Sequence, residues 1–183
     1  MYELLNEQSA ERIYQITSEK LNSKAYTCRQ LLKKANVEYV CTTEDPTDNL
    51  QYHQQLAKSD FSIKVSTAFR PDKAILINNE GYNDYINSLE KVAGTAINTY
   101  SDLRDALKNR IDFFHENGCR ISYHGLSHLY YEDFTETEIN TIFKKKREDK
   151  IVNDEEASKF QSALLLFLCE TYHQYGWVQQ FHL

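Results

Sequence analysis

The stretch that decides the fold of this chain runs Ile63-Lys64-Val65-Ser66-Thr67-Ala68-Phe69-Arg70-Pro71-Asp72-Lys73. Its apolar first half, residues 63–67, predicts a strand that delivers Phe69 and Arg70 at its end. The strand before Arg70 and the proline after it fix the direction of the side chain, so the guanidinium points out of the sheet. Such a planar fork can donate two parallel hydrogen bonds, which suits a carboxylate or a phosphate. The alternative is a surface arginine that pairs with Asp72 or another nearby acid.

Outside this stretch, the spacing of apolar residues predicts helices that alternate with short strands. Further strands are expected over residues 37–42, 120–122 and 177–183. Helices are expected in six regions: one or two over residues 10–35, one that starts at Asp45-Pro46 and includes Leu56, one over 82–89, one from Ser101 to Phe114, one that follows Thr135-x-x-Glu138, and one over 154–175.

This alternation implies parallel strands joined by helical crossovers, which is the α/β class. We expect one domain over residues 1–183, with a helical lead-in over 1–36 and βα units over 37–183. Such strands can form part of an eight-stranded (β/α)8 barrel or an open three-layer sheet, and the pattern alone leaves both possibilities open. We also expect the strands to be ordered sequentially, with right-handed crossovers.

Polar side chains follow each of the expected strands. Solvent at the strand ends would by itself favour polar residues there, but the carboxyl ends of parallel strands meet on one face, where barrel enzymes place their chemistry. The residues at these ends are Thr42, Thr43, Glu44 and Asp45 after the first strand, Arg70 and Asp72 after the second, Ser122, Tyr123 and His124 after the third, and His182 on the fourth.

Composition limits the kinds of partner. The net charge of −6 disfavours a nucleic acid, because affinity for phosphates comes mainly from lysine and arginine. The one basic run, residues 144–147, is expected at a helix C-terminus, where cations are favourable. No apolar stretch has the length of a membrane span, and the N-terminus has no signal layout. Four cysteines without C-x-x-C spacing are expected to be reduced and buried, so we expect a cytoplasmic protein with neither a membrane nor a nucleic acid as partner.

Several motifs in one order carry a resemblance to a known family. They are Val40-Cys41-Thr42-Thr43-Glu44-Asp45-Pro46, Tyr52-His53, Phe69-Arg70-Pro71-Asp72-Lys73, Phe114-His115-Glu116-Asn117-Gly118-Cys119-Arg120-Ile121-Ser122 and Gly176-Trp177-Val178-Gln179-Gln180-Phe181-His182-Leu183. Together they resemble uronate (glucuronate) isomerase, a metal-binding barrel enzyme of the amidohydrolase superfamily. The resemblance covers the middle of that family only, since its first-strand His-x-His pair and last-strand Asp-x-Arg segment are not found here. It implies a partial TIM-type barrel in which the four strands are about strands two to five.

The resemblance also implies an activity, the isomerisation of D-glucuronate to D-fructuronate and of D-galacturonate to D-tagaturonate. Arg70 is implied to hold the uronate carboxylate, and Thr42 and Thr43 to form a wall that can hydrogen-bond sugar hydroxyls. His182 stands where the superfamily has a histidine at or beside its metal, so it is a candidate metal ligand and a candidate catalytic residue. His124 and Tyr123 are the other catalytic candidates, and Tyr123 replaces the aspartate that the family usually has.

A divalent metal such as zinc is expected in the complete enzyme, and none is expected to bind this chain tightly, because one histidine cannot hold a metal. We therefore expect the chain alone to be inactive as an isomerase. The alternative is a non-catalytic half-barrel that folds or assembles without activity. Another metal hydrolase of the superfamily is disfavoured by residues 69–73. An open sheet leaves unpaired edges and an uncovered face, so a homo-oligomer is expected.

Overall fold

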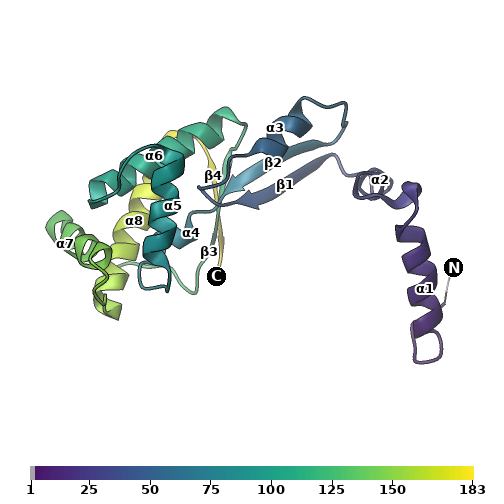
Figure 1. Ribbon diagram of the computed structural model, residues 1–183, viewed down its shortest axis with the longest axis horizontal. Coiled ribbons are helices and arrows are strands. Elements are labelled where there is room, and N and C mark those ends of the chain that lie inside the picture. Colours follow the sequence, from purple (N-terminus) through teal and green to yellow (C-terminus); the bar gives the residue numbers. More distant parts are fainter. Residues whose placement is uncertain (1–2) are drawn as a thin grey trace. The chain divides into compact units, whose positions relative to one another are not determined.

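Four strands form one sheet in the order β1-β2-β3-β4 (Figure 1). The computed structural model describes residues 3–183, and its strands are β1 (Tyr39–Glu44), β2 (Lys64–Phe69), β3 (Ile121–Gly125) and β4 (Val178–His182). Phe69 of β2 pairs with Ser122 of β3, and Tyr123 of β3 pairs with Gln180 of β4, in both cases in parallel. The predicted set of sequentially ordered parallel strands is confirmed.

Helices connect successive strands, as the alternation predicted. They are α1 (Ala10–Leu21), the short 3-10 helix η1 (Lys24–Tyr26), α2 (Cys28–Lys34), α3 (Gln51–Ala57), α4 (Asp72–Ile75), α5 (Tyr82–Ala93), α6 (Tyr100–Glu116), α7 (Glu136–Arg147) and α8 (Asp154–Gln174). The capping box predicted at Thr135 and Glu138 starts α7, and Asn153 starts α8 in the same way. Gly118 follows the C-terminus of α6 at φ 90°, a left-handed conformation that glycine adopts without strain.

Two local predictions were wrong. The helix expected from Asp45-Pro46 begins only at Gln51, because the Asp45 carboxylate accepts hydrogen bonds from the amide and hydroxyl of Thr47 and so closes a turn. Helix α6 is capped by Thr99 rather than by Ser101. The short helix α4, with Pro71 at its N-cap, was not predicted.

The chain divides into two compact units, and the smaller one comprises residues up to 40 together with 61–64. It holds α1, η1 and α2, and neither α1 nor α2 has a buried residue. Cation–π contacts supply some of its cohesion: the Lys34 ammonium lies 3.5 Å from the centroid of the Tyr26 ring, and the Arg29 guanidinium lies 5.0 Å from that of Phe61. The Lys64 amide donates to the Glu38 carbonyl oxygen.

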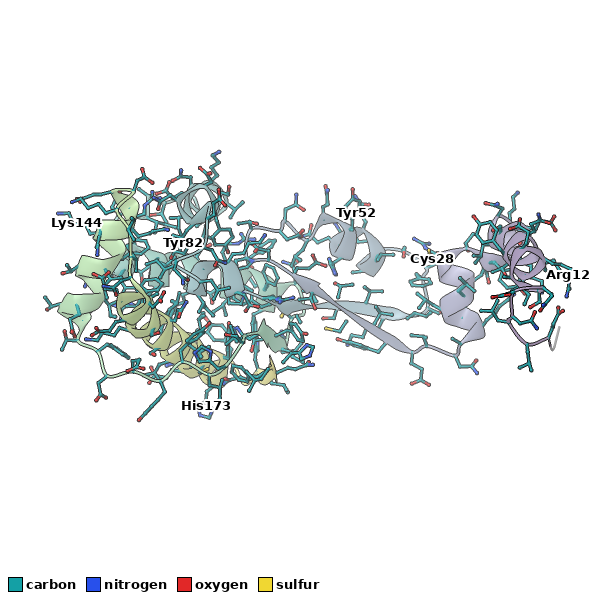
Figure 2. The ribbon with its side chains drawn as sticks, turned by 90° about the horizontal axis from the view of Figure 1, so that it is seen from below. Arg12, Cys28, Tyr52, Tyr82, Lys144 and His173 are labelled. Carbon is teal, nitrogen blue, oxygen red and sulfur yellow. The ribbon has the colours of Figure 1, made fainter. Side chains whose placement is uncertain are left out.

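The larger unit, residues 41–60 and 65–183, contains the hydrophobic core. Helices α4 to α8 gather beside β3 and β4 (Figure 1). Phe69 is fully buried, and its ring centroid lies 5.0 Å from that of Phe114, 6.2 Å from that of Tyr172 and 6.0 Å from that of Trp177. Tyr82 lies among the helices (Figure 2) and packs edge-on against Phe160 of α8. Fully burying such a side chain contributes roughly 1.5–3 kcal/mol, so this aromatic layer fixes the end of β2.

The cysteine prediction holds in part. All four thiols are free, and Cys119 is buried, but Cys28 and Cys41 are exposed. Cys41 is exposed because β1 alternates between exposed and half-covered positions, and Cys41 falls on the exposed face. No helix of residues 3–183 is both long and apolar enough to cross a membrane.

Candidate functional site

A polar cavity of about 400 Å³ opens at the carboxyl end of β1 and β2, in the larger unit of the chain. Its lining combines two cations with three carboxylates, and one glycine comes from the end of β3. The lining residues are Thr43, Glu44, Asp45, Arg70, Asp72, Lys73, Leu76 and Gly125. We call this hollow the strand-end cavity.

Arg70 is held from three sides in the strand-end cavity. Its Nε donates a hydrogen bond of 2.7 Å to Asp72 Oδ2, its Cζ lies 5.1 Å from the centroid of the Tyr123 ring, and its Nη2 lies directly over Gly125. Among the described residues, this leaves both Nη groups without a hydrogen-bond acceptor. The side chain is 42% exposed, so these donors are accessible to a solute. The pairing with Asp72 therefore orients the fork and leaves its two terminal donors available.

Gly125 makes this arrangement possible. A Cβ atom at this position would lie 2.5 Å from Arg70 Nη2, closer than any side chain permits. A glycine inside a strand often marks such a close approach. This residue type is the one signal in the sequence that could have placed Gly125 in the site, and Gly125 was not predicted there. Lys73 was also not assigned a role, although its Nζ lies 3.4 Å from Asp45 Oδ2 across the cavity.

Asp72 accepts three hydrogen bonds and connects the cavity to the interior. Besides Arg70 Nε, its donors are His124 Nδ1 at 3.0 Å and the Gly125 amide at 2.9 Å. Burial by itself would raise the pKa of Asp72, but the hydrogen bonds from His124, Arg70 and Gly125 outweigh it and lower the pKa below the ordinary 3.8. Asp72 is therefore ionised at neutral pH and acts as a fixed anion behind Arg70.

His124 is fully buried beneath the strand-end cavity rather than within it. Its ring stacks on Phe181 at 5.3 Å between centroids and lies 5.8 Å from the ring of Tyr172. Because a carboxylate only accepts, Nδ1 carries the proton shared with Asp72, and Nε2 is left as a buried acceptor without a partner. The cause is the alternation of β3, in which Ser122 and His124 face the helices while Tyr123 faces the other way.

Tyr123 and His182 lie together on the sheet face opposite the helices. The Tyr123 hydroxyl is 2.9 Å from His182 Nδ1, and this bond joins β3 to the edge strand β4. The register explains the pairing, because Gly125 lies opposite His182 and Tyr123 is two residues earlier on the same face. Tyr123 therefore contacts Arg70 through its ring and His182 through its hydroxyl.

The two threonines predicted to form a wall point in different directions. Thr43 lines the strand-end cavity. Thr42 faces α3 instead, where its hydroxyl is 2.8 Å from His53 Nε2 and 3.4 Å from the Ser66 carbonyl oxygen. The structure therefore brings together Arg70, Thr43, Tyr123 and His182 at the strand ends or on the open face, and it separates Thr42 and His124 from them.

A metal does not fit the donor set of this chain alone. Among residues 3–183, no three histidine, cysteine or carboxylate side chains gather where they could hold a metal ion. His182 can offer at most Nε2, since Tyr123 engages Nδ1.

The model of the glucuronate isomerase family matches residues 1–183. The chain belongs to the glucuronate isomerase family. A uronate isomerase from Flavobacterium johnsoniae is 63% identical over 183 residues, which are 100% of this chain and 39% of the relative. A uronate isomerase from Bacillus pumilus is 41% identical over 181 residues, which are 99% of this chain and 38% of the relative.

Solved structures agree with this membership of the glucuronate isomerase family. The crystal structure of glucuronate isomerase from Caulobacter crescentus matches with a TM-score of 0.89 at 26% identity and covers 100% of this chain and 38% of that one. The uronate isomerase from Thermotoga maritima matches in fold, with a TM-score of 0.92 at 24% identity, over 98% of this chain and 40% of that one. The resemblance found in the sequence is confirmed, and the sheet with its crossovers is part of an α/β barrel. The chain spans about 39% of the length of these relatives.

Proposed function

We propose that this chain supplies the carboxylate-binding part of a uronate isomerase, with Arg70 holding the acid group of the sugar. One observation carries the proposal: Arg70 lines the strand-end cavity and is fixed by Asp72, Gly125 and Tyr123, while both Nη groups lack an acceptor among the described residues. A uronate carboxylate can accept from both groups at once, which fixes the direction of the sugar as well as its affinity. Lys73 and Thr43 line the same cavity and can donate to the sugar hydroxyls.

The reaction proposed is the interconversion of an aldose and a ketose, D-glucuronate with D-fructuronate and D-galacturonate with D-tagaturonate. A base removes the proton from C2 of the aldehyde form, the electron pair forms the C1–C2 double bond, and O1 takes up a proton to give an enediol. A proton then returns to C1, and the proton on O2 is lost as the C2 carbonyl forms. The net change moves two protons and requires no oxidant. It needs a base in reach of the carbon acid and donors for the developing oxyanion.

Tyr123 and His182 are the proton-handling pair in this proposal. Neutral imidazole can accept a proton near physiological pH, whereas a tyrosine hydroxyl with an ordinary pKa near 10 is a poor base. We assign the proton transfer to His182 Nε2, because Tyr123 already engages Nδ1. His124 is a positioning residue in this scheme, since its buried ring reaches the cavity only through Asp72.

The whole activity is proposed for a longer assembly, because this chain spans about 39% of the length of its relatives. The test joins the chain to the parts of the Flavobacterium johnsoniae relative that flank the matched region, and D-glucuronate isomerisation is then measured. We expect no turnover from the 183-residue chain and turnover from the joined protein. A matched protein with Arg70→Ala should lose uronate activity while remaining folded, as measured by its cooperative unfolding transition.

Two results would overturn this proposal. A joined protein that folds but does not isomerise any uronate would favour the second candidate, a half-barrel without catalytic function. Turnover by the chain alone would show that no flanking segment is needed.

A further inference from the structure

Four buried polar side-chain atoms have no hydrogen-bond partner among residues 3–183. They are Tyr85 Oη, Ser122 Oγ, His124 Nε2 and Tyr172 Oη. Buried polar groups are nearly always hydrogen-bonded, so each of these atoms needs a physical explanation. His124 and Tyr172 stand out, because their rings contact each other and the proposed reaction uses neither of the two unpartnered atoms.

Tyr172 is fully buried where α8 packs against the sheet. Its ring stacks on Trp177 with 5.7 Å between centroids and meets Phe69 edge-on at 6.2 Å. The third neighbour is His124, whose ring is tilted against that of Tyr172 with 5.8 Å between centroids. Aromatic rings therefore enclose Tyr172, and its hydroxyl needs a polar partner inside the protein.

The two unpartnered atoms on Tyr172 and His124 are complementary. Burial raises the pKa of Tyr172 well above the ordinary value near 10, and interactions with Cys169 and Asp72 raise it further, so the hydroxyl keeps its proton and can donate. His124 Nε2 can accept, because Nδ1 carries the proton that His124 shares with Asp72 and a neutral imidazole has only one. A donor without an acceptor thus lies in the same buried region as an acceptor without a donor.

We propose that Tyr172, His124 and Ser122 bind one internal water molecule, which accepts from the Tyr172 hydroxyl and donates to His124 Nε2 and Ser122 Oγ. Ser122 lies on the same helix-facing side of β3 as His124, and both side chains are fully buried. An internal water typically makes about three hydrogen bonds to buried polar groups that otherwise have no partner. The three side chains supply one donor and two acceptors, which is the set that a single water needs.

This water links Tyr172 to the anion site. Which nitrogen of an imidazole carries the proton is set by the hydrogen bond that the other nitrogen makes. A water that donates to Nε2 keeps the His124 proton on Nδ1, where it is shared with Asp72, and Asp72 in turn accepts from Arg70 Nε. Tyr172 is therefore a positioning residue for Arg70, although it does not line the strand-end cavity. This last step rests on the proposed function, whereas the water site does not.

Tyr172→Phe removes the donor and keeps the ring, so the sign of its effect on stability tests the bridge. With a bound water, the unfolding equilibrium constant should rise about tenfold, the effect of losing one hydrogen bond. An unpaired hydroxyl predicts an unchanged or more stable protein, because the substitution then removes only an unsatisfied buried group. Urea unfolding is followed by circular dichroism, since Tyr172 stacks on Trp177 and its replacement would disturb the fluorescence.

Two other tyrosines are matched controls for Tyr172→Phe. Tyr82→Phe removes a buried hydroxyl that donates to the Ala74 carbonyl oxygen at 3.1 Å, so it should destabilise the chain by a similar factor. Tyr131→Phe changes a residue that is 94% exposed and should leave the unfolding constant unchanged. An effect of Tyr172→Phe that resembles Tyr131→Phe rather than Tyr82→Phe overturns the proposal.

A double substitution tests whether the bridge reaches His124. His124→Asn keeps a donor in the place of Nδ1, which can still reach Asp72, and has no group in the place of Nε2. In this background Tyr172→Phe should change the unfolding constant clearly less than in the wild-type chain, because half of the bridge is already gone. An equal effect in both backgrounds would show that Tyr172 is stabilised without His124, and it overturns the proposal.

NMR of the histidine ring nitrogens gives a readout that a merely structural role of Tyr172 would not move. Tyr172→Phe should shift the Nε2 resonance of His124, and the Arg70 Nε–H should exchange faster with solvent. A high-resolution crystal structure should show one water within hydrogen-bond distance of Tyr172, His124 and Ser122. A dry contact there, or an Nε2 resonance that Tyr172→Phe leaves unchanged, overturns the proposal. Since none of these measurements requires isomerase activity, failure of this inference is distinguishable from failure of the proposed function.

Discussion

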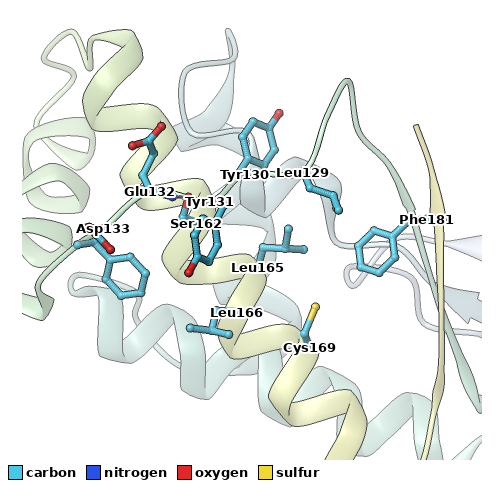
Figure 3. A pocket seen from close by; sticks show the side chains of 11 residues that line it. Leu129, Tyr130, Tyr131, Glu132, Asp133, Ser162, Leu165, Leu166, Cys169 and Phe181 are labelled. Atoms are coloured by element: carbon cyan, nitrogen blue, oxygen red, sulfur yellow. Dashed lines mark hydrogen bonds between the residues drawn. The ribbon is translucent and has the colours of Figure 1, made fainter.

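The strand-end cavity and a second hollow along α8 are both surface hollows of the larger unit, and they differ in nearly every physical respect. The second hollow, which we call the α8 groove, has a volume of about 610 Å³ and is bounded by α8, by the loop that follows β3 and by Phe181 of β4 (Figure 3). The strand-end cavity is lined by fixed charges, and its central cation is held by a network that reaches the buried His124. The α8 groove is larger and is lined mainly by leucine and aromatic side chains. The two hollows therefore differ in chemistry, because one presents oriented charge-assisted donors and acceptors and the other presents apolar surface.

The largest effect on the strand-end cavity is expected from a substitution of Asp72. Asp72→Asn removes the anion that accepts from Arg70, His124 and Gly125, so the chain should lose about 3 kcal/mol of unfolding free energy, the upper end of the range for hydrogen bonds to a charged group. Trp177 is the single tryptophan and is nearly buried, so its fluorescence during urea unfolding reports the loss. Lys150→Gln, which breaks an exposed pair with Glu148, is the control and should leave the midpoint unchanged. A loss below about 1 kcal/mol for Asp72→Asn would mean that the network is not a structural element.

Arg70→Lys tests the anion site itself in the joined protein. The substitution keeps the charge but loses the two-donor fork, so transition-state stabilisation should fall by about 1.5–3 kcal/mol for D-glucuronate. The expected signature is a reduced kcat/KM against uronates with little change for an uncharged aldose. Equal reductions for both substrates would indicate that Arg70 supports the fold rather than the substrate.

The pH dependence of stability gives a third test of the network. The folded pKa of Asp72 is lowered below its ordinary 3.8, so ionised Asp72 contributes its full stabilisation above the ordinary pKa. This contribution is lost as pH falls through the lower, folded pKa. The difference in unfolding free energy between the wild-type chain and Asp72→Asn should therefore be constant near neutral pH and shrink below pH about 4. A difference that stays constant down to pH about 2 would contradict the assigned hydrogen bonds.

Gly125→Ala should change the geometry of the strand-end cavity more than the stability of the chain. The added Cβ would lie 2.5 Å from Arg70 Nη2, and the flexible guanidinium can move away. Stability should fall by only about 1 kcal/mol, the low end of the cost of overpacking. The KM for D-glucuronate in the joined protein should nevertheless rise severalfold, because the fork no longer points into the cavity. Unchanged KM would show that Arg70 does not need its present position.

The smallest effect is expected in the α8 groove of the isolated chain. Leu166→Ser removes an apolar side chain that is 51% exposed, so unfolding free energy should change by no more than about 0.5 kcal/mol. The measurement is the same urea titration. A loss of 2 kcal/mol or more, in the range of buried leucines, would show that the groove is part of the folded core and not a free surface.

Much of the secondary structure could be predicted from the sequence, because caps and apolar spacing are local signals. Helices α5, α7 and α8 lie where the periodicity placed them, and Gly118 and Gly176 end the preceding segments at positive φ. The start of α3 was missed, since Asp45 has two competing uses, as a helix cap or as an acceptor for Thr47. Leu50, at the N-cap of α3, is fully buried at a positive φ of 53°, and no local pattern specifies that burial or that conformation.

The order and direction of the strands, the family, and the polar residues at each strand end could be predicted from the sequence, because they depend on periodicity and on motifs formed by residues adjacent in the chain. Which of those polar residues share a face could not be predicted, because it depends on how the strands pair and pack. A strand turns successive side chains to opposite sides, so His124 and Thr42 lie on the helix side, while Tyr123 and Thr43 lie on the other. The contact of Arg70 with Gly125 likewise joins residues from two strands, and such a contact exists only once the strands have paired.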